Sequence, residues 1–333
     1  MYQHFIGIDV SKHWFDAAIW TGTKAEVLGQ FTNRDDGFNE FRHAVKRLTG
    51  TDQTSWFVCF ENTGTYSKPL LYWLLKEGIS CREENAMQIS RSKGLTRGKD
   101  DLIDARIICT YAYRHKDTLE PTQLPNKSVL QIKKLLSRRT ILVGQRASLK
   151  TSLREQRYEF DEVLFQQLES QNADLIRLYT QHIQEIEKLI DQIIQTDAEM
   201  ENNCALVQSV KGVGPVIAWH LIAYTNNFKA FNHSRQFACY CGIAPFPNRS
   251  GKSFVGKNRV HHYANKHIKA LLTNSANAAV QTDLELKLYY QRKRRQGKEY
   301  GTAINAVKNK IVARVFAVVK RQSPYVPMMQ YAS

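Results

Sequence analysis

The sequence predicts an α/β domain at the N-terminus, a helical middle segment with coiled-coil character, and a mainly α-helical C-terminal domain. Three observations support this. Short apolar runs alternate with helical stretches up to about residue 116, a helical pattern runs from about Asn126 to Met200, and more helices follow. With 333 residues the chain is too long for one compact core. We place the domains at 1–120, 121–203 and 204–333.

The first domain follows a recognisable order of elements. The run Trp56–Glu61 is almost continuously apolar, which is typical of a strand buried at the centre of a sheet. The other expected strands are Phe5–Val10, Ala17–Trp20, Glu26–Phe31 and Ile79–Glu83, and the expected helices are 37–48, 66–76 and 102–114. Three strands, a helix, a strand, a helix, a strand and a helix is the order of a ribonuclease-H-like fold.

The middle segment combines a basic half with a half that carries an apolar seam. Its first half has nine Lys and Arg residues and few acids, Lys134 and Arg138 among them, which favours contact with nucleic acid over a merely solvated helix face. In the second half apolar residues recur every three or four positions, from Ile176 to Ile193. This seam fits either an antiparallel hairpin between the two halves or a contact between subunits.

The C-terminal domain is predicted to be helical around one long loop. The stretch Phe246–Gly256 is rich in Pro, Ser, Gly and Lys, which is typical of a loop. A helix is expected over about 303–320. Basic residues accumulate in and after the loop, and we expect Arg249, Lys252, Lys257 and Arg259 to contact nucleic acid.

The charge balance indicates a polyanionic partner. The chain has 47 Lys and Arg against 31 Asp and Glu, a formal net charge of +16. Nucleic acid is the first candidate, because neutralising its phosphates releases counterions. An acidic membrane surface is the alternative, although no apolar run is long enough to span a bilayer. Without a secretory signal, and with six scattered cysteines, we expect a bacterial-type cytoplasmic protein that associates with the nucleoid.

Four carboxylates form a candidate metal site. Asp9 and Glu61 end apolar runs that become neighbouring strands in the expected fold, and Asp101 and Asp104 project from one helix face. Singly, each acid is more often a turn residue. Together they are costly to assemble without cations, and they suit Mg²⁺, two ions per site, for phosphoryl chemistry.

Ser250 is a candidate nucleophile. It lies between Arg249 and Lys252, with Lys257 nearby, and these cations could stabilise charge on an attacked phosphate. A serine in a loop rich in Gly and Lys is more often a turn residue, and Ser253 is a rival.

Several motifs resemble those of one enzyme family. They are FIGIDVSK, FENTGTY and GKDDLIDA in the first domain, and GVGPVIA, CGIAPFPNRSGK and ANKHIKALLTNSA in the last. In this order they resemble DEDD insertion-sequence transposases, which have a RuvC-like N-terminal domain and a C-terminal serine transposase domain and are related to Piv-type DNA invertases. The resemblance implies that Asp9, Glu61, Asp101 and Asp104 bind metal and that Ser250 forms a phosphoserine link to DNA. It also implies donor and target DNA as substrates, a non-coding bridge RNA as guide, and a dimer or tetramer as the working form.

The sequence thus predicts a DNA transposase or site-specific recombinase. Three alternatives stay open. One is a metal-only RuvC-like nuclease or junction resolvase, in which water attacks the phosphate. Another is a Piv-like invertase that works without a guide RNA. The last is a non-catalytic scaffold that binds RNA or DNA through its basic helices.

Overall fold

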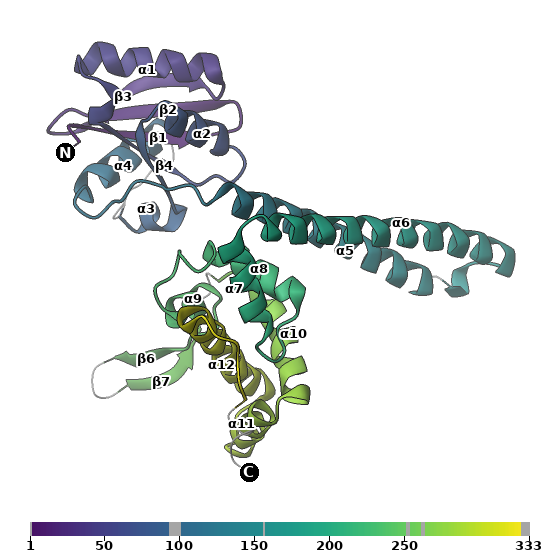
Figure 1. Ribbon diagram of the computed structural model, residues 1–333. Helices are drawn as coiled ribbons and strands as arrows, with labels where there is room; N and C mark the ends of the chain where they lie inside the picture. The colour runs from purple at the N-terminus through teal and green to yellow at the C-terminus, as the bar shows by residue number, and fades with distance from the viewer. Residues whose placement is uncertain (1, 93–100, 156, 251–253, 261–263, 328–333) are drawn as a thin grey trace. The chain divides into compact units, whose positions relative to one another are not determined.

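The computed structural model describes residues 2–92, 101–155, 157–250, 254–260 and 264–327 (Figure 1). The chain forms two compact units, Met1–Leu124 and Pro125–Ser333, each with its own hydrophobic core. The finer division at residues 120 and 203 stays a prediction.

The first unit contains a five-stranded mixed sheet. Its strands are β1 (His4–Val10), β2 (Trp14–Trp20), β3 (Ala25–Thr32), β4 (Trp56–Glu61) and β5 (Ser80–Glu84). They lie in the order β3-β2-β1-β4-β5. The first three are joined by antiparallel pairing, while β1, β4 and β5 run parallel. The predicted order of elements is confirmed except for one additional short helix, Ala86–Ser92, before the last one. The expectation that the first and fourth strands are neighbours is also confirmed.

Helices cover both faces of this sheet (Figure 1). On one face, Phe38 and Leu71 pack with Ile6. On the other face, Ile108 packs with Phe5 and its neighbours. The helices of the first face are α1 (Asp35–Thr49) and α2 (Lys68–Lys76), and those of the second are α3 (Ala86–Ser92) and α4 (Asp101–Arg114).

Gly7 sets the distance between β1 and α4. A Cβ atom at this position would overlap the backbone of Ala105 and Cys109, so only glycine allows the helix to lie this close to the strand. The Cys109 thiol donates to the Phe5 carbonyl at 3.4 Å, whereas Ala105, one turn earlier, lies at Gly7. The helix therefore runs antiparallel to β1, and its N-terminal end lies where β1 ends.

The second unit begins with two long helices that lie side by side, α5 (Lys127–Glu155) and α6 (Glu162–Gln195) (Figure 1). Arg139 pairs with Glu187 at 2.7 Å, and Arg146 donates to Thr180 at 3.1 Å. The partner on α6 moves toward a lower residue number as the position on α5 moves toward a higher one, so the two helices are antiparallel. The two helices thus form an antiparallel hairpin, one of the two expected arrangements, and the seam residues Ile183, Ile186 and Ile190 are buried.

The remaining helices share one apolar core with this hairpin. They are α7 (Ala198–Gln208), α8 (Pro215–Thr225), α9 (Ser234–Tyr240), α10 (Lys266–Thr282), α11 (Leu284–Arg295) and α12 (Tyr300–Arg321). The α7–α8 turn contains Gly212 at φ +86°, whose carbonyl accepts a 2.7 Å hydrogen bond from the Ser275 hydroxyl. No helix in the described ranges is long and apolar enough to cross a membrane.

The prediction of a loop over Phe246–Gly256 is wrong in one respect. This stretch contains β6 (Phe246–Ser250) and the beginning of β7 (Phe254–Arg259), which pair antiparallel. Its Pro and Gly content indicated a loop, but the pairing of two short strands depends on contacts that composition does not report.

Candidate active site

Asp9 and Glu61 lie side by side at one end of the sheet. The last pair of the parallel β1–β4 ladder joins Ile8 to Phe60, and these two acids are the next residue on each strand. Paired residues of a ladder point to the same face, and Asp9 shares the face of Gly7, two residues earlier. Both carboxylates therefore project toward the face that α4 covers.

The helix α4 adds a third acid to this edge. Asp104 is half-buried and directly precedes Ala105, the residue that lies against Gly7. Asp101 is the first residue of α4 and lies one turn before Asp104 on the same face of the helix. Its side chain lies outside the described residues. The fold thus brings Asp9, Glu61 and Asp104 to one end of the sheet, with the backbone of Asp101 beside them.

Two further carboxylates extend this row, and the sequence analysis missed both. Asp16 is paired with Asp9 across β1 and β2, and it is buried, with Gln30 Nε2 at 3.2 Å. Glu84 is paired with Glu61 across β4 and β5 and is also buried. The expected strands began at Ala17 and ended at Glu83, so each acid fell one residue outside its strand.

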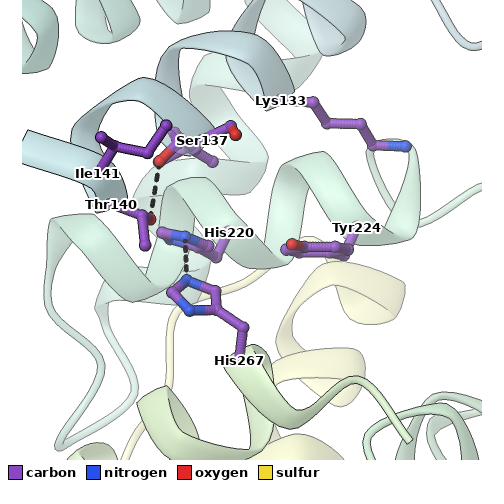
Figure 2. A pocket seen from close by; sticks show the side chains of 8 residues that line it. Lys133, Ser137, Thr140, Ile141, His220, Tyr224 and His267 are labelled. Carbon is purple, nitrogen blue, oxygen red and sulfur yellow. Dashed lines mark hydrogen bonds between the residues drawn. The ribbon is translucent and has the colours of Figure 1, made fainter. Parts of the chain in front are cut away.

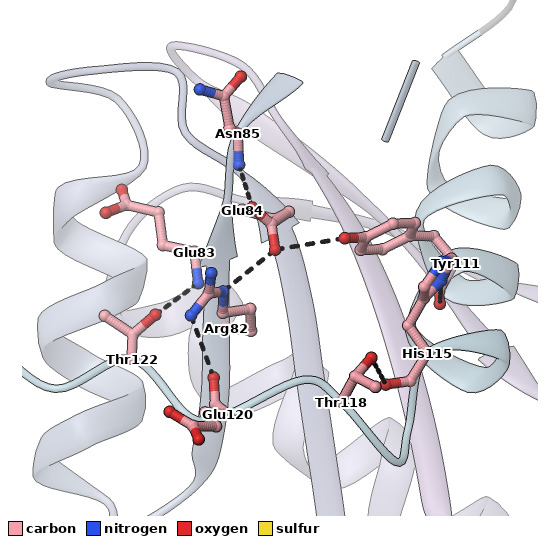
Figure 3. A network of polar contacts seen from close by, with 9 residues as sticks. All are labelled: Arg82, Glu83, Glu84, Asn85, Tyr111, His115, Thr118, Glu120 and Thr122. Atoms are coloured by element: carbon pink, nitrogen blue, oxygen red, sulfur yellow. Dashed lines mark hydrogen bonds and ion pairs between the residues drawn. The ribbon is translucent and has the colours of Figure 1, made fainter. Parts of the chain in front are cut away.

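Glu84 is saturated by donors from the protein (Figure 3). Its carboxylate accepts from Arg82 Nε at 3.1 Å, from the Asn85 backbone at 2.8 Å and from the Tyr111 hydroxyl at 3.3 Å. Burial first, and then the charge of Glu84, raises the pKa of Tyr111 to about 12, which keeps this hydroxyl a donor. Glu84 therefore links β5 to α4 through a hydrogen bond, next to Glu61 in the row of carboxylates.

The chemistry of the acid set fits a hard divalent cation. Carboxylate oxygens are the ligands that Mg²⁺ prefers, and several carboxylates at one sheet edge repel one another unless a cation lies between them. Among side chains that the structure describes, no group of three or more His, Cys, Asp and Glu is already close enough to hold a metal ion. The Asp101 side chain, the fourth predicted ligand, lies outside that set.

Ser250 is the last residue of β6 and pairs with Phe254. Its side chain and those of Arg249, Lys257 and Arg259 lie outside the described residues, as does all of Lys252. On α5, Lys134 and Arg138 are both exposed and one turn apart, so they share a surface. By contrast, Arg139 and Arg146 from the same basic stretch form an ion pair and a hydrogen bond with side chains of α6.

A pocket of about 410 Å³ in the second unit contains two facing histidines from α8 and α10 (Figure 2). The Nε2 atoms of His220 and His267 are 3.1 Å apart, and His220 Nδ1 lies 2.8 Å from the Val216 carbonyl. Because a carbonyl only accepts, His220 carries its proton on Nδ1 and accepts from His267. Burial lowers the pKa of His220 to about 4, so it stays neutral. The pair is a satisfied contact between a buried and a half-buried histidine.

Two protein-family models match this chain, one over its N-terminal part and one over its C-terminal part. A transposase model for the DEDD domain of the IS110 group matches residues 6–159, and a model described as the transposase IS116/IS110/IS902 family matches residues 204–291. The two matches are in the order of the family and together include most of the chain. The chain belongs to the IS110/IS116 family of DEDD transposases. Enzymes of this family cut and rejoin DNA strands.

Individual relatives place this IS110/IS116-family transposase among recombination proteins. A pilin gene-inverting protein of Moraxella bovis is 24% identical over 329 residues, which is 98% of each chain. An uncharacterised protein of insertion element IS900 from Mycobacterium paratuberculosis is 27% identical over 43% of this chain and 37% of its own length. The structure of T. thermophilus RuvC in complex with a Holliday junction substrate aligns with 36% of this chain and all of that chain, at 12% identity and a TM-score of 0.26.

Proposed function

We propose that this transposase recombines DNA of an insertion sequence through a Mg²⁺-assisted phosphoserine intermediate. One observation carries the proposal. Asp9, Glu61 and Asp104 lie at the same end of the sheet because Gly7 lets α4 lie on β1. With Asp101 they would hold Mg²⁺, two ions per site, and this metal would supply charge stabilisation at the reacting phosphate. The ribonuclease-H-like, RuvC-like character of the first unit belongs to this proposal, supported by its strand order.

Ser250 is the proposed nucleophile. Its Oγ attacks the phosphorus, a P–Oγ bond forms, the bond from phosphorus to the leaving deoxyribose oxygen breaks, and the serine proton passes to that oxygen. A hydroxyl of the receiving strand then attacks the phosphoserine, which breaks the P–Oγ bond and returns the proton to Ser250. Arg249 and Lys252 flank the serine in sequence and would stabilise the negative charge of both transition states.

The proposal includes nucleic-acid partners and an assembly. Donor and target DNA would bind to basic side chains. These are Lys134 and Arg138 on α5, and Lys257 and Arg259 in the hairpin that contains Ser250. A bridge RNA would guide the enzyme, and the +16 formal charge favours polyanionic partners of this kind. A dimer or tetramer in the cytoplasm, associated with the nucleoid, completes the proposal.

Site-specific inversion without a guide RNA is the second candidate. The full-length similarity to a pilin gene-inverting protein favours it. Ribonuclease treatment of the purified protein separates the two candidates, because a guided transposase would lose recombination and regain it with the added RNA. An invertase would be indifferent to the treatment.

Cleavage of labelled DNA that spans the junction of the element tests the metal site. With Mg²⁺ present, Asp9→Asn and Glu61→Gln are each expected to reduce strand cleavage by roughly a thousandfold. The matched control is Asp36→Asn, since Asp36 is an exposed acid on α1, across the sheet. Cleavage by the Asp9 and Glu61 variants at the control's rate would reject the carboxylate site.

A further inference from the structure

A pocket of about 660 Å³ lies in the second unit between α10, α12 and the base of the β6–β7 hairpin. Pro245 and Val260, which flank the two strands, form one side. The other side carries polar and basic residues of the two helices, namely Lys269, Thr302, Asn305, Lys308 and Asn309. None of the described residues that line it is acidic, and the row of carboxylates belongs to the other unit.

Lys308 is a buried cation that faces this pocket. Only 5% of the residue is exposed, because it lies on the apolar face of α12 between Ile304 and Val312. Two influences act on its pKa, burial first and then the charge of Lys269, and both lower it. Among the described residues no carboxylate offsets them. A buried ammonium without a counterion is costly, so the pocket is built to receive negative charge.

Lys269 reinforces this preference from the opposite helix. It lines the same pocket from α10, and its charge acts on Lys308 across the space between them. The walls are fixed in place, because Asn305 and Asn309 both donate to the Ile243 carbonyl, at 2.6 and 2.8 Å. Two convergent lysines on fixed walls repel a metal ion and attract an anion.

The first turn of α12 adds backbone donors. The N-cap residue Glu299 makes no side-chain capping bond, and Gly301 and Thr302 line the pocket. No described atom lies within 4 Å of the place where a Cβ on Gly301 would be. The first N–H groups of a helix have no intrahelical acceptor, and they lie at its positive end. Six residues separate Thr302 from Lys308, about 9 Å along the axis, a span that suits a chain of phosphates better than one small anion.

We propose that this pocket binds the DNA backbone at a phosphate that flanks the reacting one. Ser250 stands five residues beyond Pro245, roughly 16 Å along β6, so the pocket is too far along the strand to hold the phosphate that Ser250 would attack. The proposal rests on the proposed function only in taking DNA as the polyanion. It requires neither Ser250 nor a metal ion to be catalytic.

Salt-dependent DNA binding by the full-length protein, without divalent metal, tests the assignment. The probe is a fluorescein-labelled DNA duplex, followed by anisotropy over a series of KCl concentrations. Lys308→Met is expected to weaken binding roughly fivefold and to reduce the slope of log K against log [KCl] by about 0.9, as the loss of one phosphate contact should. Its thermal midpoint should equal or exceed that of the wild type, because the variant removes an unpaired buried charge.

Lys310→Met is the matched control. Lys310 is on the same helix, is exposed, and lies 5.5 Å from the centre of the Tyr289 ring instead of in the pocket. It should change the slope and affinity much less than Lys308→Met. Equal effects of the two variants, or no effect of Lys308→Met while the wild type binds DNA, would overturn the proposal. Absence of DNA binding by the wild type would instead contradict the proposed function.

Acetylation of the wild-type protein provides a second readout that needs no folded variant. Acetic anhydride labels accessible lysines, and mass spectrometry reports the extent at each one. Excess DNA duplex should protect Lys269, the half-buried lysine of the pocket, severalfold, while Lys24 on the other unit changes less. Equal labelling with and without DNA would overturn the assignment. So would protection by inorganic phosphate alone, which indicates a small-anion site, or by an RNA duplex alone, which indicates RNA.

Discussion

Asp9 and Asp16 are directly opposite each other on antiparallel strands β1 and β2, so their carboxylates share one face of the sheet. Asp16 is buried and bonded to Gln30, which places a second negative charge beside the predicted metal ligand. Two neighbouring carboxylates favour a cation between or beside them. The proposed metal site would therefore be influenced by a residue outside the four predicted acids.

Asp16→Asn should weaken the response to Mg²⁺ without abolishing activity. The substitution keeps the shape and the contact with Gln30 but removes the neighbouring charge. We expect the Mg²⁺ concentration for half-maximal cleavage to rise roughly tenfold, with the rate at saturating Mg²⁺ retained. Cleavage rates measured over a magnesium titration test this. An unchanged titration, equal to that of Asp36→Asn, would show that Asp16 does not influence the site.

Gly7→Ala should disrupt the first unit. The added methyl group overlaps the backbone of α4, which cannot move without losing its contact with β1, so we expect a loss of about 3 kcal/mol or more in the free energy of unfolding. Gly144→Ala is the control, since Gly144 is in α5 with open space around it, and it should gain about 0.5–1 kcal/mol. Urea denaturation measures both. A tolerated Gly7→Ala would refute the close approach of α4.

Tyr111→Phe should cost about 1–2 kcal/mol of stability, because Glu84 then loses one of its three donors while remaining buried. Tyr113→Phe should cost less than about 0.5 kcal/mol, since Tyr113 contacts Phe5 and Trp20 through its ring. The comparison uses thermal or urea unfolding of the two variants. Equal losses would mean that the hydroxyl of Tyr111 contributes nothing through Glu84.

Acid should destabilise the second unit through His220. Its folded pKa of about 4 is below the ordinary value of 6.5, so the unfolded chain takes up a proton in that interval and the folded chain does not. Stability contributed by the neutral histidine is complete above pH 6.5 and falls by about 3 kcal/mol as the pH approaches 4. His267 and Arg139, the charged or titratable neighbours, act in the same direction.

Unfolding free energies of the wild type and His220→Phe, measured across this pH interval, test the prediction. The variant begins with lower stability because it loses two hydrogen bonds, and its stability should then decline less with acid. Parallel declines in the two proteins would show that other groups cause the acid sensitivity.

Local patterns were sufficient to predict most of the first unit. The observed β4, Trp56–Glu61, has the predicted bounds, and the neighbouring strands differ by a few residues at most. Asp9 and Glu61 were recognised because each ends an apolar run, and the strand order then made them neighbours. Asp16 was missed because it interrupts an apolar run, and only the register with β1 makes its position meaningful.

The second unit was harder to predict because its features depend on contacts between distant segments. The composition of the β6–β7 segment predicts a loop, whereas its two strands pair. The three-domain division stays a prediction beside two compact units. Lys308 did offer a signal in the sequence, since it follows Ile304 by one helical turn on an apolar face. Its significance depends on Lys269, 39 positions earlier, which no local pattern connects to it.

The most direct test of the central claim is a search for a covalent protein–DNA intermediate. The protein, with any RNA that copurifies with it and with Mg²⁺, would be incubated with labelled junction DNA that carries a trapping nick. The Ser250→Ala and Asp101→Asn variants would be treated in the same way, and the products resolved on a denaturing gel. We expect a protein–DNA adduct in the wild type that is absent from both variants. Cleavage without an adduct, persisting in Ser250→Ala, would contradict it and indicate a metal-only nuclease.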